Sequence, residues 1–218
     1  MTDYSRLRER MVQRQIAGRG VRSEKVLDAM RKVPRERFLP NGQAVWAYDD
    51  APLPIGDGQT ISQPYIVAYM TEALALVGGE KVLEIGTGSG YAAAVLAEIA
   101  ADVYTIERID GLAIMARMIL DQLGYQNVHV RQGDGTLGWP EHAPFDGIVV
   151  TAGGPDVPDT LKNQLKIGGR LVMPIGTTTW YQELVRVTRI TETEFDMEYL
   201  MPVRFVPLIG EGGWDSQV

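Results

Sequence analysis

The segment that most constrains the fold runs from Val82 to Tyr91, where a short apolar stretch ends in an acid and three alternating glycines follow. A pattern of this kind is typical of a β-strand that turns sharply into a helix. The glycines are Gly86, Gly88 and Gly90, and glycine lets a backbone turn tightly and approach a ligand closely. The segment therefore predicts an α/β sheet whose first strand-to-helix turn is a ligand-binding loop.

The acid beside this loop narrows the class of ligand. Glu84 lies two residues before the first glycine, where a carboxylate would repel a pyrophosphate. The dinucleotide-binding pattern also requires a third glycine at the position of Tyr91. S-adenosylmethionine has no phosphate but carries a sulfonium, an ammonium and a ribose diol. The loop therefore predicts S-adenosylmethionine as the cofactor, S-adenosylhomocysteine as its product, and methyl transfer as the chemistry.

Composition limits the partners that we expect. The chain has 21 basic and 28 acidic residues and a net charge of -7, which disfavours binding along a nucleic-acid backbone. It has no cysteine, so disulfides and thiolate metal sites are excluded, and we expect no metal. No apolar run has the character of a signal peptide or the length of a membrane span. We expect a cytoplasmic monomer without nucleic-acid or membrane partners.

The order of the predicted elements indicates an α/β fold with a doubly wound, mostly parallel, Rossmann-like sheet. Strands are predicted at residues 81–85, 103–106, 128–132, 145–151 and 170–174, and helices at 91–99, 111–123 and 157–164. The strands are short and continuously apolar, as expected when helices cover both faces of a sheet. Alternation from Glu183 to Arg189, followed by another run to Leu208, predicts an antiparallel edge.

Residues 1–76 are predicted to supply N-terminal helices and an active-site loop that pack on a core of residues 77–218, as one unit. Helices are expected at residues 3–16, 24–33 and 64–76, and Ser23 is expected to cap the second. Between Pro34 and Gly58 the turn-forming residues recur at short intervals. We expect irregular structure there, with at most one helical turn near Ala44. Long ordered loops of this kind are often functional.

Candidate ligand contacts follow the ends of successive strands. Glu107 ends the second strand about 20 residues after Gly86, the spacing at which an acid meets a ribose diol. Asp134 follows the third strand, where it could accept from an adenine amino group while Gly135 leaves room for the ring. The small residues at 151–154 could form a wall of the methyl-transfer site.

Each of these residues also has a purely structural interpretation. The glycines could serve only the turn, Glu107 could cap the next helix, and Asp134 could form an Asx turn. His129 lies in a predicted strand and His142 in a proline-flanked loop, so neither histidine is expected to be catalytic.

Three further blocks are distinctive: GQTISQP at 58–64, PFDGIVVTAG at 144–153 and LKIGGRLVMPIG at 165–176. Together with the LEIGTGSGY block at 83–91, they make nearly the whole chain resemble the protein-L-isoaspartate O-methyltransferases, a family of protein-repair carboxyl methyltransferases. The GQTISQP block is the more specific, because LEIGTGSGY alone would indicate only a class I methyltransferase.

The resemblance implies methyl transfer from S-adenosylmethionine to the α-carboxyl of L-isoaspartyl residues in damaged proteins and peptides. The ester would then collapse to a succinimide, which initiates repair. The family pattern places Ser62 in the active site, with Thr60 beside it in the same loop. The implied cofactor contacts are Glu84, Gly86, Thr87, Gly88, Gly90, Glu107, Arg108, Asp134, Gly135 and Gln182.

This chemistry needs no general base. A carboxyl with a pKa near 4 is already ionised at pH 7, and a sulfonium is already activated. Ser62 is therefore expected to hold the acceptor carboxylate rather than to attack, although it could also cap the helix that begins at Pro64. Three other interpretations remain open: a class I methyltransferase for a small molecule or RNA, a cofactor-binding sensor without turnover, and an NAD-linked oxidoreductase.

Overall fold

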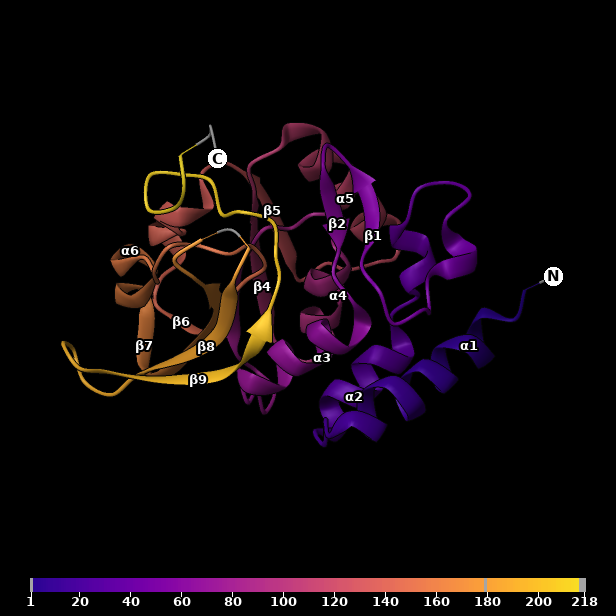
Figure 1. The fold of residues 1–218 in the computed structure, drawn as a ribbon, viewed down its shortest axis with the longest axis horizontal. Coiled ribbons are helices and arrows are strands. Elements are labelled where there is room, and N and C mark those ends of the chain that lie inside the picture. The colour runs from indigo at the N-terminus through magenta and orange to yellow at the C-terminus, as the bar shows by residue number, and fades with distance from the viewer. Residues whose placement is uncertain (1, 179, 216–218) are drawn as a thin grey trace.

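The computed structural model, which describes residues 2–178 and 180–215, contains a seven-stranded sheet in the order β5-β4-β3-β6-β7-β8-β9 (Figure 1). The pairs from β5 through β7 are parallel, whereas β8 and β9 pair antiparallel at the edge. The predicted doubly wound, mostly parallel sheet with an antiparallel edge is confirmed. The strands are β3 (Lys81–Ile85), β4 (Asp102–Glu107), β5 (Val128–Gln132), β6 (Phe145–Val150), β7 (Leu165–Ile175), β8 (Gln182–Arg189) and β9 (Phe195–Val203).

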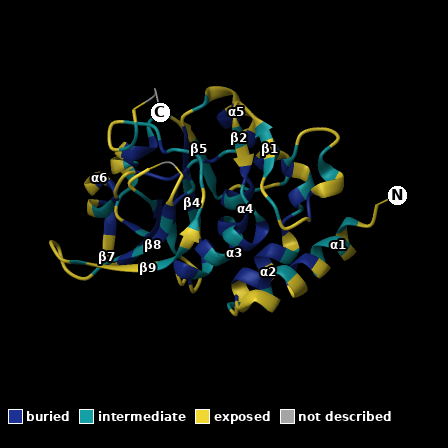
Figure 2. Ribbon diagram, in the orientation of Figure 1, coloured by how far each residue is buried: buried dark blue, intermediate teal, exposed yellow. Residues whose placement is uncertain are grey.

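Alternate residues of the central strands pack into two hydrophobic layers, one on each face of the sheet (Figure 2). Val82 and Val149 belong to the first layer, and their neighbours Leu83 and Ile148 to the second. This period of two follows from the strand geometry, in which successive side chains point to opposite faces. The helices that contribute to these layers are α3 (Pro64–Ala73) and α4 (Tyr91–Ala97) for the first, and α6 (Asp159–Asn163) for the second.

The N-terminal helices form a further layer over α3 and α4, at the end of the molecule opposite β7 to β9 (Figure 1). Helix α1 (Tyr4–Met11) continues as a π-helical turn (Val12–Ile16), and α2 is Glu24–Lys32. The fully buried Arg35 joins this layer to the glycine loop. Its Nε donates to the carbonyl of Ala47 at 2.7 Å, and its guanidinium lies 4.9 Å from the ring of Tyr91, the first residue of α4. None of the described helices has the length and apolar character needed to cross a membrane.

A two-stranded hairpin lies where irregular structure was predicted, so this part of the prediction was wrong. It consists of β1 (Leu53–Gly56) and β2 (Gln59–Ile61), joined by two residues. These residues, Asp57 and Gly58, have φ values of 50° and 70°. Two positive φ values in a two-residue loop match the twist of a hairpin, and Asp-Gly is a strong sequence signal for such a turn.

The N-terminus of α2 is capped by a residue distant in sequence. The backbone N–H groups of Arg22 and Ser23 both donate to Oε1 of Glu72, on α3, at 2.6 Å. The Ser23 side chain makes no capping hydrogen bond, although Ser23 occupies the predicted position. Glu72 on α3 therefore fixes the backbone just before α2, and the predicted cap by the Ser23 side chain does not form.

We expect Glu72→Ala to lower the free energy of unfolding by about 1 to 2 kcal/mol, because two N–H groups lose a charged acceptor. Urea denaturation measures this change. Ser23→Ala is the matched control and should change stability by less than about 0.5 kcal/mol. A Ser23→Ala variant as unstable as Glu72→Ala would show that the local cap operates.

Candidate active site

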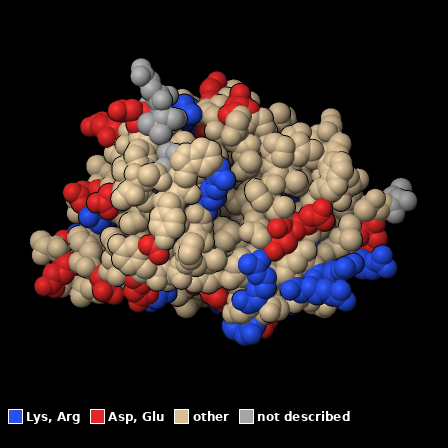
Figure 3. Space-filling model, in the orientation of Figure 1, with Lys and Arg blue, Asp and Glu red and all other residues tan. Residues whose placement is uncertain are grey.

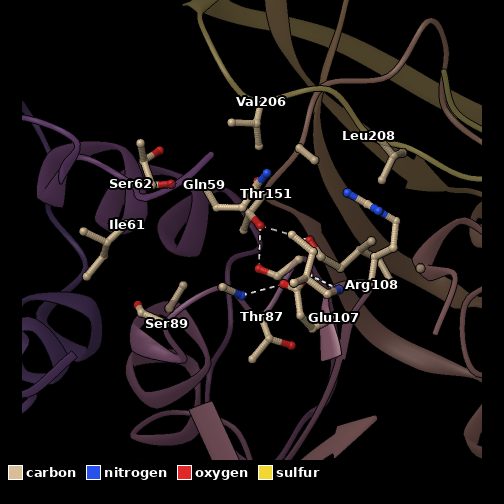
Figure 4. A pocket seen from close by; sticks show the side chains of 18 of the residues that line it. Gln59, Ile61, Ser62, Thr87, Ser89, Glu107, Arg108, Thr151, Val206 and Leu208 are labelled. Atoms are coloured by element: carbon tan, nitrogen blue, oxygen red, sulfur yellow. Dashed lines mark hydrogen bonds between the residues drawn. The ribbon is translucent and has the colours of Figure 1, made fainter. Parts of the chain in front are cut away.

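A cavity of about 270 Å³, here called the inner cavity, lies at the carboxyl ends of β3, β4 and β6 (Figure 4). Gly86, Glu107 and Thr151, each following or ending one of these strands, line it. The carboxyl ends of parallel strands are where ligands bind in open α/β sheets. The hairpin residues Gln59 to Ser62 and the segment Val206 to Ile209, after β9, complete the wall.

The carboxylate of Glu107 organises the glycine loop. Its Oε2 accepts from the N–H of Gly88 at 2.8 Å, and its Oε1 accepts from the N–H of Ile109 at 2.9 Å. Ile109 is the N-cap residue of α5 (Asp110–Gln122), so Glu107 also bonds at the start of the next helix, as the structural alternative proposed. One side chain thus joins the loop after β3 to the helix after β4.

At two glycines of the cavity wall, any side chain would collide with the neighbouring chain. A Cβ on Gly86, whose φ is 94°, would lie 2.4 Å from Oγ1 of Thr151. A Cβ on Gly135 would lie 2.3 Å from Cγ2 of Ile85. The same Thr151 hydroxyl donates to the carbonyl oxygens of Ile85 and Gly86, at 3.0 and 2.7 Å. The packing of the chain around the cavity therefore requires glycine at these two positions.

Glu84 lies behind the loop, which differs from the prediction that its carboxylate faces the ligand. It belongs to β3 itself and is fully buried. Its Oε2 accepts from the hydroxyl of Thr105 at 2.6 Å, and that hydroxyl lies 2.6 Å from the hydroxyl of Thr87, which lines the cavity. Burial raises the pKa of Glu84 to about 8, so the group is protonated at pH 7.

Most of the predicted site residues are brought together by the fold. Eight of them line the inner cavity: Thr60, Ser62, Gly86, Thr87, Gly88, Glu107, Arg108 and Gly135. Figure 4 shows Ser62 on one side of this cavity, with Glu107 and Arg108 on the other. The predicted wall at 151–154 contributes Thr151 and Ala152.

The other predicted cofactor contacts support the cavity from outside. A Cβ on Gly90 would lie 3.3 Å from side chains of α5, so this glycine permits close helix packing. Asp134 accepts from the N–H groups of Thr136 and Glu211, at 2.8 and 2.9 Å, which agrees with its turn-forming alternative. Gln182 exchanges two hydrogen bonds with the backbone of Phe205, at 2.8 and 3.2 Å, and so positions the segment after β9.

A second cavity of about 810 Å³, here called the outer cavity, adjoins the inner one. The residues that line both are Thr60, Ser62, Thr151, Val206 and Pro207. The Ser62 hydroxyl makes no hydrogen bond with a described residue, and Gln63 rather than Ser62 occupies the N-cap position of α3. The capping alternative for Ser62 is therefore not supported, and its hydroxyl is available where the cavities meet.

Sequence reasoning missed part of the outer cavity, including Arg19, Trp180 and Arg204. The outer cavity is also lined by residues 205–207, which follow β9 without regular structure, and such a segment carries no periodic pattern from which its position could be inferred. His129 and His142 lie elsewhere, with ring centroids 4.7 and 4.2 Å from that of Tyr104, and neither lines a cavity.

Comparison with known proteins decides the family. The profile of the Protein-L-isoaspartate(D-aspartate) O-methyltransferase (PCMT) family matches residues 6–213. The chain belongs to this family. A relative from Rhodopseudomonas palustris (strain HaA2), named protein-L-isoaspartate O-methyltransferase 1, is 63% identical over 99% of this chain and 88% of its own length. One from Syntrophus aciditrophicus (strain SB), a protein-L-isoaspartate O-methyltransferase, is 59% identical over 99% of this chain and 100% of its own length.

Two solved structures have the same fold as this chain. One protein, named protein-L-isoaspartate O-methyltransferase, has a TM-score of 0.87 and 33% identity, covering 94% of this chain and 67% of its own. A Plasmodium falciparum protein is described as a beta-aspartate methyltransferase in complex with S-adenosyl-L-homocysteine. It has a TM-score of 0.80 and 22% identity, and the match covers 93% of this chain and 98% of its own. The resemblance drawn from the GQTISQP and LEIGTGSGY blocks is confirmed.

The raised pKa of Glu84 predicts a pH-dependent difference in stability between this member of the PCMT family and its Glu84→Gln variant. The folded chain keeps a proton on Glu84 up to about pH 8, whereas the unfolded chain releases it near its ordinary pKa of about 4.3. The contribution of protonated Glu84 to the free energy of unfolding is therefore fully present below about pH 4 and is lost as pH rises toward 8. Glutamine mimics the protonated form and does not titrate.

Chemical denaturation of both proteins between pH 5 and 8 measures this difference. The stability of the wild type relative to Glu84→Gln should fall by more than about 1.4 kcal/mol over that range, the equivalent of one pKa unit. Parallel pH profiles would contradict the burial of a protonated carboxyl.

Proposed function

We propose that this chain transfers a methyl group from S-adenosylmethionine to the α-carboxyl of L-isoaspartyl residues in damaged proteins and peptides, initiating repair through a succinimide. The observation that carries the proposal is the meeting of two cavities at Ser62. The inner cavity has the features of a cofactor site, and the outer cavity is large enough to admit a peptide segment. Membership of the PCMT family supports the same reaction.

The residues of the inner cavity fit the cofactor. Gly86, Gly88 and Gly135 line this cavity and present only backbone to a ligand. The carboxylate of Glu107 uses two of its roughly four lone-pair sites on backbone N–H groups, so it can still accept from a ribose diol. When bound, S-adenosylmethionine supplies an electrophilic methyl group on a sulfonium. Thr87 and Arg108 would complete its surroundings from the loop and from the end of β4.

The residues at the junction of the cavities would position the acceptor. The acceptor carboxylate is ionised at pH 7 and requires no base, and neither histidine lines either cavity. The Ser62 hydroxyl would donate to this carboxylate, with Thr60 beside it, while Val206 and Pro207 exclude water. Proximity and alignment of this kind contribute up to about 7 to 11 kcal/mol in well-oriented reactions.

Under this proposal, the two parts of the chain contribute different residues to the site. Residues 1–76 supply Ser62, Thr60 and part of the outer cavity, and residues 77–218 supply the cofactor cradle. We further propose a monomer that acts in the cytoplasm on proteins rather than on nucleic acid. The net charge of -7 and the absence of cysteine support this environment and this class of partner.

The decisive experiment is incubation with radiolabelled S-adenosylmethionine and an L-isoaspartyl peptide. The proposal predicts a base-labile methyl ester on this peptide and none on the matched aspartyl peptide. Equal labelling of both peptides, or labelling of neither, would contradict it. Binding of NAD in preference to S-adenosylhomocysteine would favour the oxidoreductase alternative.

Replacing Ser62 with alanine should lower kcat by about 10- to 100-fold, because the acceptor carboxylate loses a hydrogen bond to a charged group. Affinity for S-adenosylhomocysteine should remain nearly unchanged, and calorimetry measures it. Ser5→Ala removes an exposed hydroxyl from α1 and serves as the control with wild-type turnover. Full turnover by Ser62→Ala would exclude the assigned role.

A further inference from the structure

Two arginines line the outer cavity, and their surroundings differ. The charge of Arg19 is already paired, because its Nη1 lies 2.7 Å from Oδ2 of Asp50. Its guanidinium also lies 3.6 Å from the centroid of the Tyr65 ring. Arg204 has no acidic partner among the described residues. Its side chain makes neither an ion pair nor a hydrogen bond with any residue at 2–178 or 180–215. Only the second arginine is therefore available to an external anion.

An aromatic ring holds the Arg204 guanidinium at the rim of the cavity. The guanidinium lies 4.4 Å from the centroid of the Trp180 ring, and Trp180 is 73% exposed. Trp180 belongs to the connection between β7 and β8, whereas Arg204 directly follows β9. A stack of this kind orients the planar guanidinium while leaving its N–H groups accessible.

The charge around Arg204 is a further observation. The chain carries a net charge of -7, and Arg204 is an exposed cation at the rim of the outer cavity. Figure 3 shows a small basic patch over the segment that follows β9, apart from the basic side chains that gather over α1 and α2. The patch is surrounded by uncharged side chains, so an anion that enters the cavity meets little local repulsion.

The position of Arg204 indicates which part of a substrate it meets. Ser62, Thr151 and Val206 line both cavities, whereas Arg204 lines only the outer one. Its Cα lies at most about 7 Å from that of Val206, the span of two extended residues. In an extended peptide, residues two positions apart are separated by a similar distance, about 7 Å. A carboxylate at the junction would therefore place the next residues of the peptide beside Arg204.

We propose that Arg204, oriented by Trp180, forms a subsite for an acidic side chain that flanks the isoaspartyl residue of the substrate. This inference rests on the proposed methyl transfer and adds a charge preference to it. Arg204 does not contact the transferred carboxyl group in this account. It distinguishes peptides by the residue beside that group, so that acidic neighbours are favoured over neutral ones and basic neighbours are disfavoured.

The experiment compares kcat/KM for three sets of L-isoaspartyl peptides that share one otherwise neutral sequence. The sets carry glutamate, glutamine or lysine at positions up to two residues before or after the isoaspartyl residue, and the glutamine set is the neutral reference. Wild type should prefer glutamate over glutamine by about two- to fivefold on at least one side, the range of a partly exposed ion pair. The preference should shrink as salt concentration rises.

Arg204→Gln should reduce this ratio to about one, and Arg204→Glu should reverse it in favour of lysine. Trp180→Ala should weaken the preference, because the guanidinium loses its orientation. Arg6→Gln removes an exposed arginine of α1 that lines neither cavity, and it should keep the wild-type ratio. Calorimetric affinity for S-adenosylhomocysteine checks that each variant has folded.

The outcomes separate this inference from the proposed function. Absence of methylation on every isoaspartyl peptide would contradict the function itself. Methylation by wild type without any preference between glutamate and glutamine would overturn only the subsite. An equal loss of kcat/KM on all peptides in Arg204→Gln would also overturn it, because that result would place Arg204 on the transferred carboxyl group.

Discussion

The inner cavity depends on the two hydrogen bonds that Glu107 accepts from the backbone. Glu107 is 7% exposed, and its carboxylate accepts from the N–H groups of Gly88 and Ile109, which belong to the turns after two adjacent strands. A carboxylate so nearly removed from water requires hydrogen-bond donors. The donors are backbone N–H groups of the two turns, so the hydrogen bonds that stabilise the carboxylate also fix the shape of the glycine loop. The sheet brings the turns together because β3 and β4 are parallel neighbours.

The acceptor side of the site is built differently, from segments far apart in sequence. The hairpin β1–β2 brings Thr60 and Ser62 from one end of the chain, and the segment after β9 brings Val206 from the other. Backbone hydrogen bonds of 2.8 Å from Gly153 to Val206, and from Leu208 to Gly153, attach this segment beside the end of β6. The junction of the two cavities therefore depends on contacts between distant segments, whereas the glycine loop depends on turns at the ends of two adjacent strands. A cofactor site and an acceptor site with different structural origins meet at one serine.

This difference explains how much the sequence alone could predict. The strand and glycine pattern predicted the sheet and the position of Glu107, because both follow from local periodicity and from the rule that ligands bind at strand ends. Glu84 was predicted to face the ligand, but as a residue within β3 it points into a helix-covered layer. The hairpin turn at Asp57-Gly58 carried a local signal that the surrounding prolines and glycines obscured. Arg204 and Trp180 carried no local sequence signal. Their contact joins the segment after β9 to the connection between β7 and β8, which only the folded sheet brings together.

Some predicted contact residues support the site instead of lining it. Gln182, Asp134 and Gly90 were predicted as cofactor contacts, yet each bonds or packs against neighbouring chain and lines neither the inner nor the outer cavity. A site assembled from main-chain N–H groups and glycines needs such support, since its precision depends on where the backbone lies. We therefore expect these three residues to act through the geometry of the segments that they fix.

Calorimetric titration of S-adenosylhomocysteine into wild type and Glu107→Gln tests the central claim most directly. The account predicts that wild type binds this ligand and that Glu107→Gln weakens binding by at least about tenfold, because the charged acceptor shared by loop and ligand is lost. Glu141→Gln, which neutralises an exposed acid outside both cavities, should bind as wild type does. Equal affinities for wild type and a folded Glu107→Gln variant would contradict the account.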